Sequence, residues 1–321
     1  MTKDFYEKAK FNNLYKVGEE KAQGLLLEEN ESGKGIMQCF DVAPGIQISY
    51  NNLKMDTCFQ PICFDKDFLQ INYCLEGCYE FEYESGNVSF LGEGDVCVDF
   101  LPKDKQVFSA SRIPLGRYRG ITILLEIETA QKSLDKEFQK KHIDLYKIKD
   151  CLCSNESSLI IKSKYEITNI FRDLYSVDMR IKEPYAWLKT VELLLLLSLL
   201  DNGSVSSPGK FSFEVSRRTK EVYQYIIKNP LSKDTISELA ERFGLTESSL
   251  KRCFKSLSGY SIGEFVKTKC MESAAEMLIY KPALSIGEIG SLAGYENQSK
   301  FSAAFKSVIG TTPQAYRQSK T

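Results

Sequence analysis

Histidine is almost missing from this sequence of 321 residues, which contains a single one, His142. A metal site built from several imidazoles is therefore excluded, as is a catalytic pair that passes a proton between two imidazoles. His142 follows two lysines, and we expect it on the solvated surface of a helix. The ten cysteines include no Cys-x-x-Cys pair, so we expect reduced thiols that fill cores, without a metal or a cofactor.

Long apolar runs are missing as well. The longest, residues 191–200, is interrupted by Glu192 and Ser198 and has only half of the ~20 residues that cross a bilayer. The first ten residues are charged and lack the apolar core of a secretion signal. These absences predict a cytoplasmic protein without a membrane partner.

Charge of one sign is not in excess over the whole chain, which has 42 Lys and Arg against 43 Asp and Glu. The charges are unevenly divided, however. Residues 211–321 hold 16 basic and 11 acidic side chains, whereas residues 1–210 hold 26 and 32. A mildly basic segment joined to an acidic one is compatible with a nucleic-acid-binding module attached to another domain.

Between residues 46 and 125, apolar side chains alternate with polar ones in runs separated by glycine-rich turns. This pattern predicts an antiparallel β-barrel, and the turn Gly92-Glu93-Gly94-Asp95 resembles the short loop of cupin-like barrels. We expect Glu80, Glu82 and Glu84 on a solvated outer face. Four aromatic residues either fill the core or line a ligand pocket: Tyr73, Tyr79, Phe81 and Tyr83.

From about residue 128 to residue 200 the apolar period changes to that of helices. The second of two predicted helices has leucine at every position from 193 to 197, so its apolar surface is wide. It packs either inside the molecule or against a second copy of the chain. Residues 201–210 combine Asn, Gly, Ser and Pro and predict a linker. We therefore expect a sensor and dimerisation domain at 1–200 and a second domain at 211–321.

The second domain contains an internal repeat with a period of about fifty residues. Thr235-Ile236-Ser237-Glu238 is matched by Ser285-Ile286-Gly287-Glu288, and each has the form of the capping box that starts a helix. A glycine follows six residues later in both copies, and then a second N-cap, with one extra residue in the turn of the second copy. Each copy predicts a helix-turn-helix, at about 235–257 and 285–308.

A helix is predicted between the two copies, at residues 262–280, because apolar residues recur there every four positions and Pro282 follows. At ~1.5 Å per residue it is nearly 30 Å long, about one turn of B-DNA. A rigid helix of that length can place two recognition helices in successive major grooves on one face of the duplex.

Residues 217–319 resemble the DNA-binding domain of AraC/XylS-type transcriptional regulators. The resemblance is carried by residues 250–255, by the linking helix, and above all by residues 301–306 and 310–317. It implies an all-α C-terminal domain that binds double-stranded promoter DNA, and it fits an N-terminal sensor domain made of a barrel and helices. It further implies a transcription activator rather than an enzyme, with RNA polymerase, a small-molecule effector and a second copy of the chain as further partners.

The faces of the two recognition helices select the residues expected to touch DNA. The first helix presents Ser248, Lys251, Arg252 and Lys255. By resemblance the first three reach base edges; Arg252 suits a bidentate contact to guanine, and Lys255 suits a phosphate. The second helix presents Gln298, Ser299, Lys300 and Lys306. Because Ala303 stands where many family members have Arg, we expect this unit to contribute mainly phosphate contacts and recognition of DNA shape.

The sequence is also compatible with two other functions. Some relatives of this DNA-binding domain are fused to a metal-thiolate alkyl-transfer domain, whose thiolates would come from Cys58, Cys63, Cys74 and Cys78. These cysteines lie among predicted strands and lack the paired spacing of zinc ligands. The other alternative is a regulator that a protein partner controls without a small ligand. A free pocket in the barrel favours a ligand, and a filled barrel favours a partner.

Overall fold

The computed structural model describes residues 25–57, 63–138, 143–153, 158–161, 165–200 and 209–320. His142, Cys58 and most of the predicted linker lie outside these residues. The chain divides into two compact units, Met1–Phe213 and Glu214–Thr321, which are described separately. The division falls three residues after the end of the predicted linker. No helix in the described part of the chain is long and apolar enough to span a bilayer.

The first unit is built on strands that all pair antiparallel. Two of them precede the predicted strand region and two follow it. The strands are β1 (Leu25–Asn30), β2 (Gly33–Ala43), β3 (Ile46–Lys54), β4 (Phe68–Tyr83), β5 (Asn87–Gly92), β6 (Val96–Leu101), β7 (Phe108–Arg112), β8 (Tyr118–Glu126), β9 (Ser158–Ile161) and β10 (Phe211–Ser212).

Strand β4 organises this unit because its two halves have different partners. Its first half lies between β6 and β8, and its second half lies between β5 and β7. The chain turns between the halves at Gly77, whose φ is +87° and where a Cβ would lie 2.0 Å from the carbonyl oxygen of Arg117. The strand order runs β9-β6-β4-β8-β3-β2-β1 on one side and β10-β5-β4-β7 on the other.

The predicted fold class, an antiparallel β domain with helices joined to an all-α domain, is confirmed. Closure into a ring is not observed, because among the described residues the end strands β1 and β10 each pair with one neighbour. The physical reason lies in β4, which distributes its partners over two sheets instead of continuing one sheet around a barrel.

Helices cover one face of the larger sheet: α2 (Ile127–Phe138), α3 (Leu145–Cys153), α4 (Tyr165–Ser176), the short 3-10 helix η1 (Met179–Ile181) and α5 (Lys182–Ser198). The main apolar core lies between them and the sheet. There, the rings of Tyr73 and Phe171 stack with centroids 4.5 Å apart. A second core lies among the strands and includes Phe81 and Tyr118.

Helix α5 buries one face and exposes another. Leu193, Leu194 and Leu197 are buried in the main core. The exposed fractions of Leu188 in α5 and of Leu199, which directly follows this helix, are 64% and 76%. Packing inside the molecule therefore accounts for one side of the wide apolar surface, and contact with a second copy through the exposed leucines stays a prediction.

The prediction for Glu80 is wrong. Its side chain is completely buried, and the guanidinium of Arg112 lies 2.9 Å from its carboxylate and also pairs with Glu82. Arg112 stands directly opposite Glu80 on the neighbouring strand, so the two charges form a cross-strand pair. Glu84, at the end of the predicted face, is exposed as expected.

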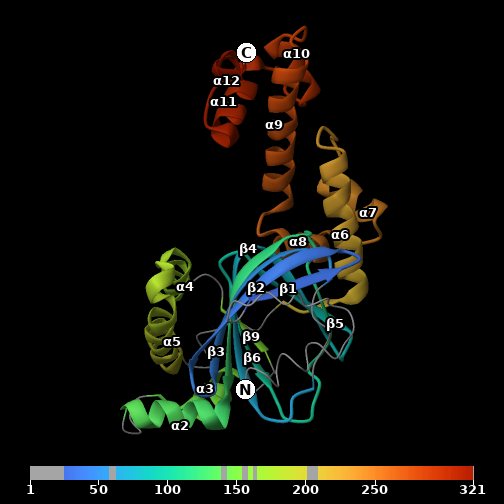
Figure 1. Cartoon of the computed structure of the whole chain (residues 1–321). Coiled ribbons are helices and arrows are strands. Elements are labelled where there is room, and N and C mark those ends of the chain that lie inside the picture. The colour runs from blue at the N-terminus through green and yellow to red at the C-terminus, as the bar shows by residue number, and fades with distance from the viewer. Residues whose placement is uncertain are drawn as a thin grey trace. The chain divides into compact units, whose positions relative to one another are not determined.

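The second unit is helical: α6 (Phe213–Lys228), α7 (Ile236–Arg242), α8 (Glu247–Ser258), α9 (Ile262–Tyr280), α10 (Ile286–Leu292), α11 (Gln298–Ile309) and α12 (Pro313–Lys320). It contains two apolar cores. One joins α6, α7 and α8 to the start of α9, and the other joins the rest of α9 to α10, α11 and α12. Figure 1 shows α9 as a long helix with α10, α11 and α12 gathered at one end.

Candidate nucleic-acid interface

The first helix-turn-helix consists of α7 and α8, and both helices begin as the sequence predicts. The hydroxyl of Thr235 accepts a hydrogen bond from the amide of Glu238, whose carboxylate accepts one from the amide of Thr235 in return. At the start of α8, the hydroxyl of Thr246 accepts a hydrogen bond from the amide of Ser249, without the reciprocal bond. Gly244, in the turn between them, has a φ of +62°, a backbone angle that residues with a Cβ rarely adopt.

The outward face of α8 carries all four predicted DNA-contacting residues. Ser248, Lys251, Arg252 and Lys255 are all exposed. The opposite face is fully buried and holds α8 against its neighbours: Leu250, Cys253, Phe254 and Leu257. The ammonium of Lys251 lies 2.7 Å from the carboxylate of Glu247, and an exposed pair of this kind contributes little to stability.

The second helix-turn-helix, α10 and α11, repeats this construction. Ser285 and Glu288 form a reciprocal capping box, and the Asn297 side chain accepts hydrogen bonds from the amides of Ser299 and Lys300. The predicted contact residues Gln298, Ser299, Lys300 and Lys306 are all exposed.

The first helix of each copy has a small residue at an equivalent position, Ala240 in α7 and Gly290 in α10. Gly290 is buried, and a Cβ there would lie 3.2 Å from the ring of Phe301, which is completely buried in α11. The matching residue Ala240 is also buried. The extra residue of the second turn follows Gly294, which has a φ of +85°. The two helices of the second copy therefore approach closely at Gly290, and the first copy has a buried small residue at the equivalent position.

Helix α9 joins the two copies as one element. Its 19 residues span about 28 Å at 1.5 Å per residue, as predicted. It packs against α8 near its start and against α10, α11 and α12 farther along. The ammonium of Lys267 donates to the hydroxyl of Ser307 in α11 at 3.1 Å. The second recognition helix is thus fixed directly to the linking helix.

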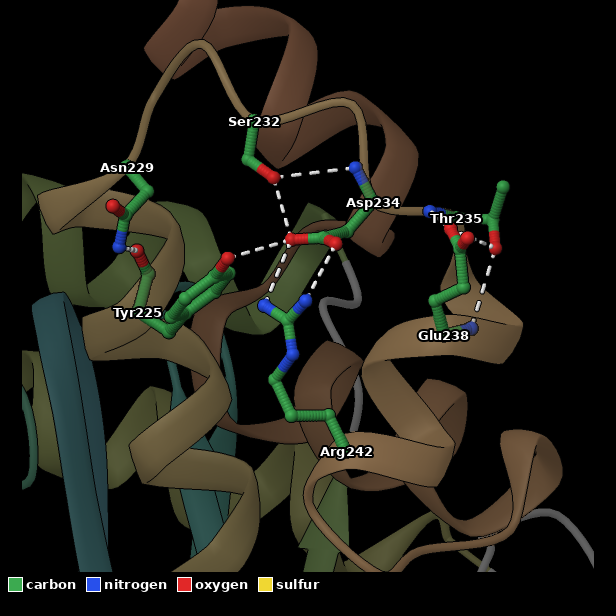
Figure 2. Close-up of polar contacts among 7 residues, drawn as sticks. All are labelled: Tyr225, Asn229, Ser232, Asp234, Thr235, Glu238 and Arg242. Atoms are coloured by element: carbon green, nitrogen blue, oxygen red, sulfur yellow. Dashed lines mark hydrogen bonds and ion pairs between the residues drawn. The ribbon is translucent and has the colours of Figure 1, made fainter.

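A polar network holds the loop between α6 and α7 (Figure 2). The carboxylate of Asp234 accepts hydrogen bonds from the hydroxyls of Tyr225 and Ser232 and forms a two-point ion pair with Arg242, with N–O distances of 2.9 and 3.0 Å. The guanidinium of Arg242 also lies 4.8 Å from the centre of the Tyr225 ring. Hydrogen bonds from Ser232 and Tyr225, together with the charge of Arg242, lower the pKa of the Asp234 carboxyl.

Sequence reasoning missed two positioning features of this unit. Arg218 of α6 donates to the carbonyl oxygen of Gly244 at 2.7 Å and so ties the turn before α8 to α6. Ser261 and Glu264 form a third reciprocal capping box at the start of α9. The Ser-x-x-Glu spacing could have predicted the capping box of α9. The contact of Arg218 could not be predicted in this way, because its partner lies 26 residues away.

The predicted ligand-pocket residues are only partly brought together. Tyr79 lies 4.9 Å from Phe81, and the rings of Phe81 and Tyr83 both contact Phe108. Tyr73 lies in the main core against Phe171 instead. Cavities in the described part of the chain lie elsewhere. One of about 420 Å³ is lined by Asp41, Ala43, Pro44, Gly45, Glu126 and Thr129, and one of about 240 Å³ lies between α3 and the end of α5. The role of the four aromatic residues stays a prediction.

The described cysteines are free thiols. Cys74 and Cys78 are buried, and burial raises the pKa of the Cys74 thiol well above its usual value. Within the described ranges, no three His, Cys, Asp or Glu side chains are grouped so that they could hold a metal ion. Nothing in this part of the chain therefore favours the metal-thiolate alternative, and Cys58 lies outside it.

Residues 239–319 match the family model of a helix-turn-helix domain. The probable transcription factor PqrA of Proteus vulgaris is 33% identical over 86 residues, which cover 27% of this chain and 70% of PqrA. The transcriptional regulator RipA of Corynebacterium glutamicum is 28% identical over 100 residues, and the match spans 31% of this chain but only 30% of RipA. The solved C-terminal domain of AraT, a response regulator from Geobacillus stearothermophilus, is 34% identical, with 34% of this chain and 86% of that chain covered and a TM-score of 0.30.

The similarity to PqrA and the family match both lie in the unit that contains the repeated helix-turn-helix. With the two capped helix pairs and the linking helix in place, the chain belongs to the AraC/XylS family of transcriptional regulators.

Proposed function

We propose that this protein is a cytoplasmic, sequence-specific DNA-binding activator of transcription, whose first unit responds to an effector. The observation that carries the proposal is the repeated helix-turn-helix with a polar, exposed face on both recognition helices. On α8 and α11 all eight predicted contact residues are exposed, while Leu250, Cys253, Phe254 and Leu257 of α8 and Phe301 and Phe305 of α11 are buried. An exposed polar face on the second helix of such a motif is the surface that enters the major groove.

The two recognition helices are proposed to have different tasks. On α8, Ser248, Lys251 and Arg252 read bases, with Arg252 donating two hydrogen bonds to a guanine, and Lys255 binds phosphate. On α11, exposed Ala303 offers no hydrogen-bonding group, so Lys300 and Lys306 serve mainly as phosphate contacts. Sequence preference should therefore come chiefly from the first unit of the repeat.

The first unit is proposed to supply the regulation. An effector shifts the population between two states of the protein, and the states differ in how two DNA-binding units meet their sites. The exposed leucines of α5 are the proposed contact with a second copy of the chain. RNA polymerase is the proposed partner at the promoter.

Arg252 and Lys255 provide a matched test on one helix. A duplex selected from a random DNA pool and a scrambled duplex are titrated with the full chain at several salt concentrations. Arg252→Ala should weaken binding to the selected duplex by roughly 1–3 kcal/mol and relax base preference at one position. Lys255→Ala should weaken binding to both duplexes alike. It should also lower the number of counterions released on binding, measured from the salt dependence of the affinity, by about one. Equal losses on both duplexes from both changes would contradict the assigned roles, and no binding by the unaltered chain would contradict the function.

A further inference from the structure

The two copies of the helix-turn-helix are joined by more than the linking helix α9. The loop of residues 229–235 connects α6 to α7 of the first copy, yet its half-buried Leu231 packs against the apolar core of the second copy. Lys233 of the same loop lies beside the turn between α10 and α11, since a Cβ on Gly294 would be 3.8 Å from the Cε atom of Lys233. We call residues 229–235 the clasp.

The clasp is itself fixed to the first copy at both of its ends. Near α6, the side-chain amide of Asn229 donates to the carbonyl oxygen of Tyr225 at 3.0 Å, and the backbone amide of Ser232 donates to the carbonyl oxygen of Asn229 at 3.0 Å. Near α7, Asp234 forms its two-point ion pair with Arg242 (Figure 2). Charge-assisted bonds of this kind hold a definite geometry. Leu231 therefore projects from a loop that α6 and α7 hold in place.

Helix α9 by itself is an incomplete brace for the two recognition helices. The first copy packs near the start of α9, and α10, α11 and α12 pack farther along it. Among the described residues, the two apolar cores have no member in common. Long helices bend gently, and bending of α9 between the two cores would move α11 relative to α8. A contact between the copies outside α9 opposes this movement, and Leu231 makes such a contact.

We propose that the clasp holds the second recognition helix in a fixed position relative to the first, and that Leu231 is its main positioning residue. Leu231 lies outside both recognition helices, so it acts through the core that carries α10 and α11. A helix that is already in position loses little conformational freedom when it binds, so the second contact with DNA adds more affinity. This inference rests on the proposed function, since it requires that both recognition helices bind one duplex.

Four variants of the full chain separate positioning from folding. Leu231→Ala removes the contact with the second core, whereas Leu231→Met keeps an apolar side chain of similar volume. Asp234→Asn frees the clasp from Arg242 without changing Leu231, and it provides a second test if Leu231→Ala does not fold. Ile227→Ala is the matched control, because Ile227 is an exposed aliphatic residue near the end of α6 and belongs to neither core. Circular dichroism verifies that each variant is folded.

The distance between two spin labels reports the position of the recognition helices without DNA. Lys255 and Lys306 are exposed and occupy matching positions of the two copies. Both are replaced by an encoded ketone-bearing amino acid, because the ten cysteines would compete for thiol-directed labels. Pulsed electron paramagnetic resonance should give one narrow distance distribution in the unaltered background, in Leu231→Met and in Ile227→Ala. The distribution should be about twofold wider in Leu231→Ala and in Asp234→Asn. Equal widths in all backgrounds would overturn the proposal.

Binding to two duplexes then tests what the position of the second helix contributes. The long duplex contains the selected site and the next major groove, and the short duplex ends after the groove that α8 reads. Leu231→Ala should bind the short duplex within about twofold of the unaltered chain. The ratio of the two affinities, long over short, should fall at least about fivefold in this variant, and Leu231→Met and Ile227→Ala should retain it.

The two measurements distinguish failure of the clasp from failure of the proposed function. An equal loss on both duplexes in Leu231→Ala would show that the residue only stabilises the fold, and an unchanged affinity ratio would show that it positions nothing. Either result overturns the proposal. If the unaltered chain binds neither duplex, the proposed function fails, while the spin-label distances still decide whether the clasp fixes the two helices.

Discussion

At the residue scale, buried or half-buried charges carry much of the structural information in this protein. Asp234 ties α6, α7 and their loop together through four donor atoms, and Arg112 is fixed by two glutamates. Neither arrangement was predictable from the sequence, because Glu80 and Arg112 are 32 residues apart. The N-caps were predictable, because a cap and its partner lie within three residues of each other.

Replacing Asp234 with Asn should loosen the start of the first helix-turn-helix. The side-chain amide oxygen of Asn still accepts a hydrogen bond from Tyr225 or Ser232, but the ion pair with Arg242 is lost. We expect the free energy of unfolding to fall by roughly 1–2 kcal/mol. Hydrogen exchange of the amides of α7 should speed up accordingly. Because the pKa of Asp234 is lowered in the folded chain, the difference from the unaltered protein should shrink as the pH falls below about 4. An unchanged exchange rate at neutral pH would contradict this role.

Asp99 should make the first unit less stable as the pH rises. Complete burial raises the pKa of its carboxyl to about 6, although hydrogen bonds from Cys97 and Asn72 partly offset this effect. The unfolded chain loses this proton at lower pH than the folded chain, so stability falls between about pH 4 and pH 6 and stays lower above it.

Asp99→Asn should remove this pH dependence. Relative to the variant, the free energy of unfolding of the unaltered chain should fall by about 2–3 kcal/mol across that window. Urea titrations followed by the fluorescence of Trp187, the sole tryptophan, report the first unit specifically. The free energy of unfolding of the unaltered chain, taken relative to that of Asp99→Asn, should not stay constant or rise with pH. Either result would contradict the description of Asp99 as a buried acid.

At the element scale, helices were predicted better than strands. The boundaries of α7, α8, α10 and α11 follow from local capping patterns and from apolar residues on one face. Strands β1, β2, β9 and β10 were not predicted. The last two are short and pair with strands that are distant in the sequence, whereas β1 and β2 pair with their sequence neighbours. The two residues of β10 have no pattern of their own and are ordered by β5, more than a hundred residues earlier.

Two glycines of α10 should respond in opposite ways to the same change. Gly290→Ala places a methyl group 3.2 Å from the buried ring of Phe301, and we expect a loss of about 1–3 kcal/mol. In Gly287→Ala the new methyl group makes only ordinary van der Waals contacts. The higher helix propensity of Ala should raise the free energy of unfolding by up to about 1 kcal/mol. Thermal unfolding followed by circular dichroism tests the pair. Equal effects of the two changes would contradict the close approach of α10 and α11.

At the scale of the whole molecule, the sequence predicted two domains and the class of each. It did not reveal that the segment before α6 is a strand of the first unit, because only the pairing with β5 makes it one. The exposed leucines in and just after α5 are one apolar surface of the described residues for which the fold of one chain gives no explanation.

A double change at Leu188 of α5 and at Leu199, the residue that follows this helix, should separate copies of the chain. Leu188→Glu with Leu199→Glu puts charges on the two most exposed leucines of this region, and we expect self-association to weaken at least about tenfold. Analytical ultracentrifugation over a range of concentrations measures this. Ile36→Glu, at an exposed residue of β2, is the control and should leave association unchanged. Equal sedimentation of the α5 variant and the unaltered chain would rule out this contact.

Hydroxyl-radical footprinting of the full chain on a selected duplex tests the central claim most directly. The length of α9 predicts two protected backbone regions from each chain, one helical turn or about 10 base pairs apart on the same face of the DNA. Lys300→Ala with Lys306→Ala should weaken the second region and leave the first. A single protected region, or two regions on opposite faces of the duplex, would contradict the account.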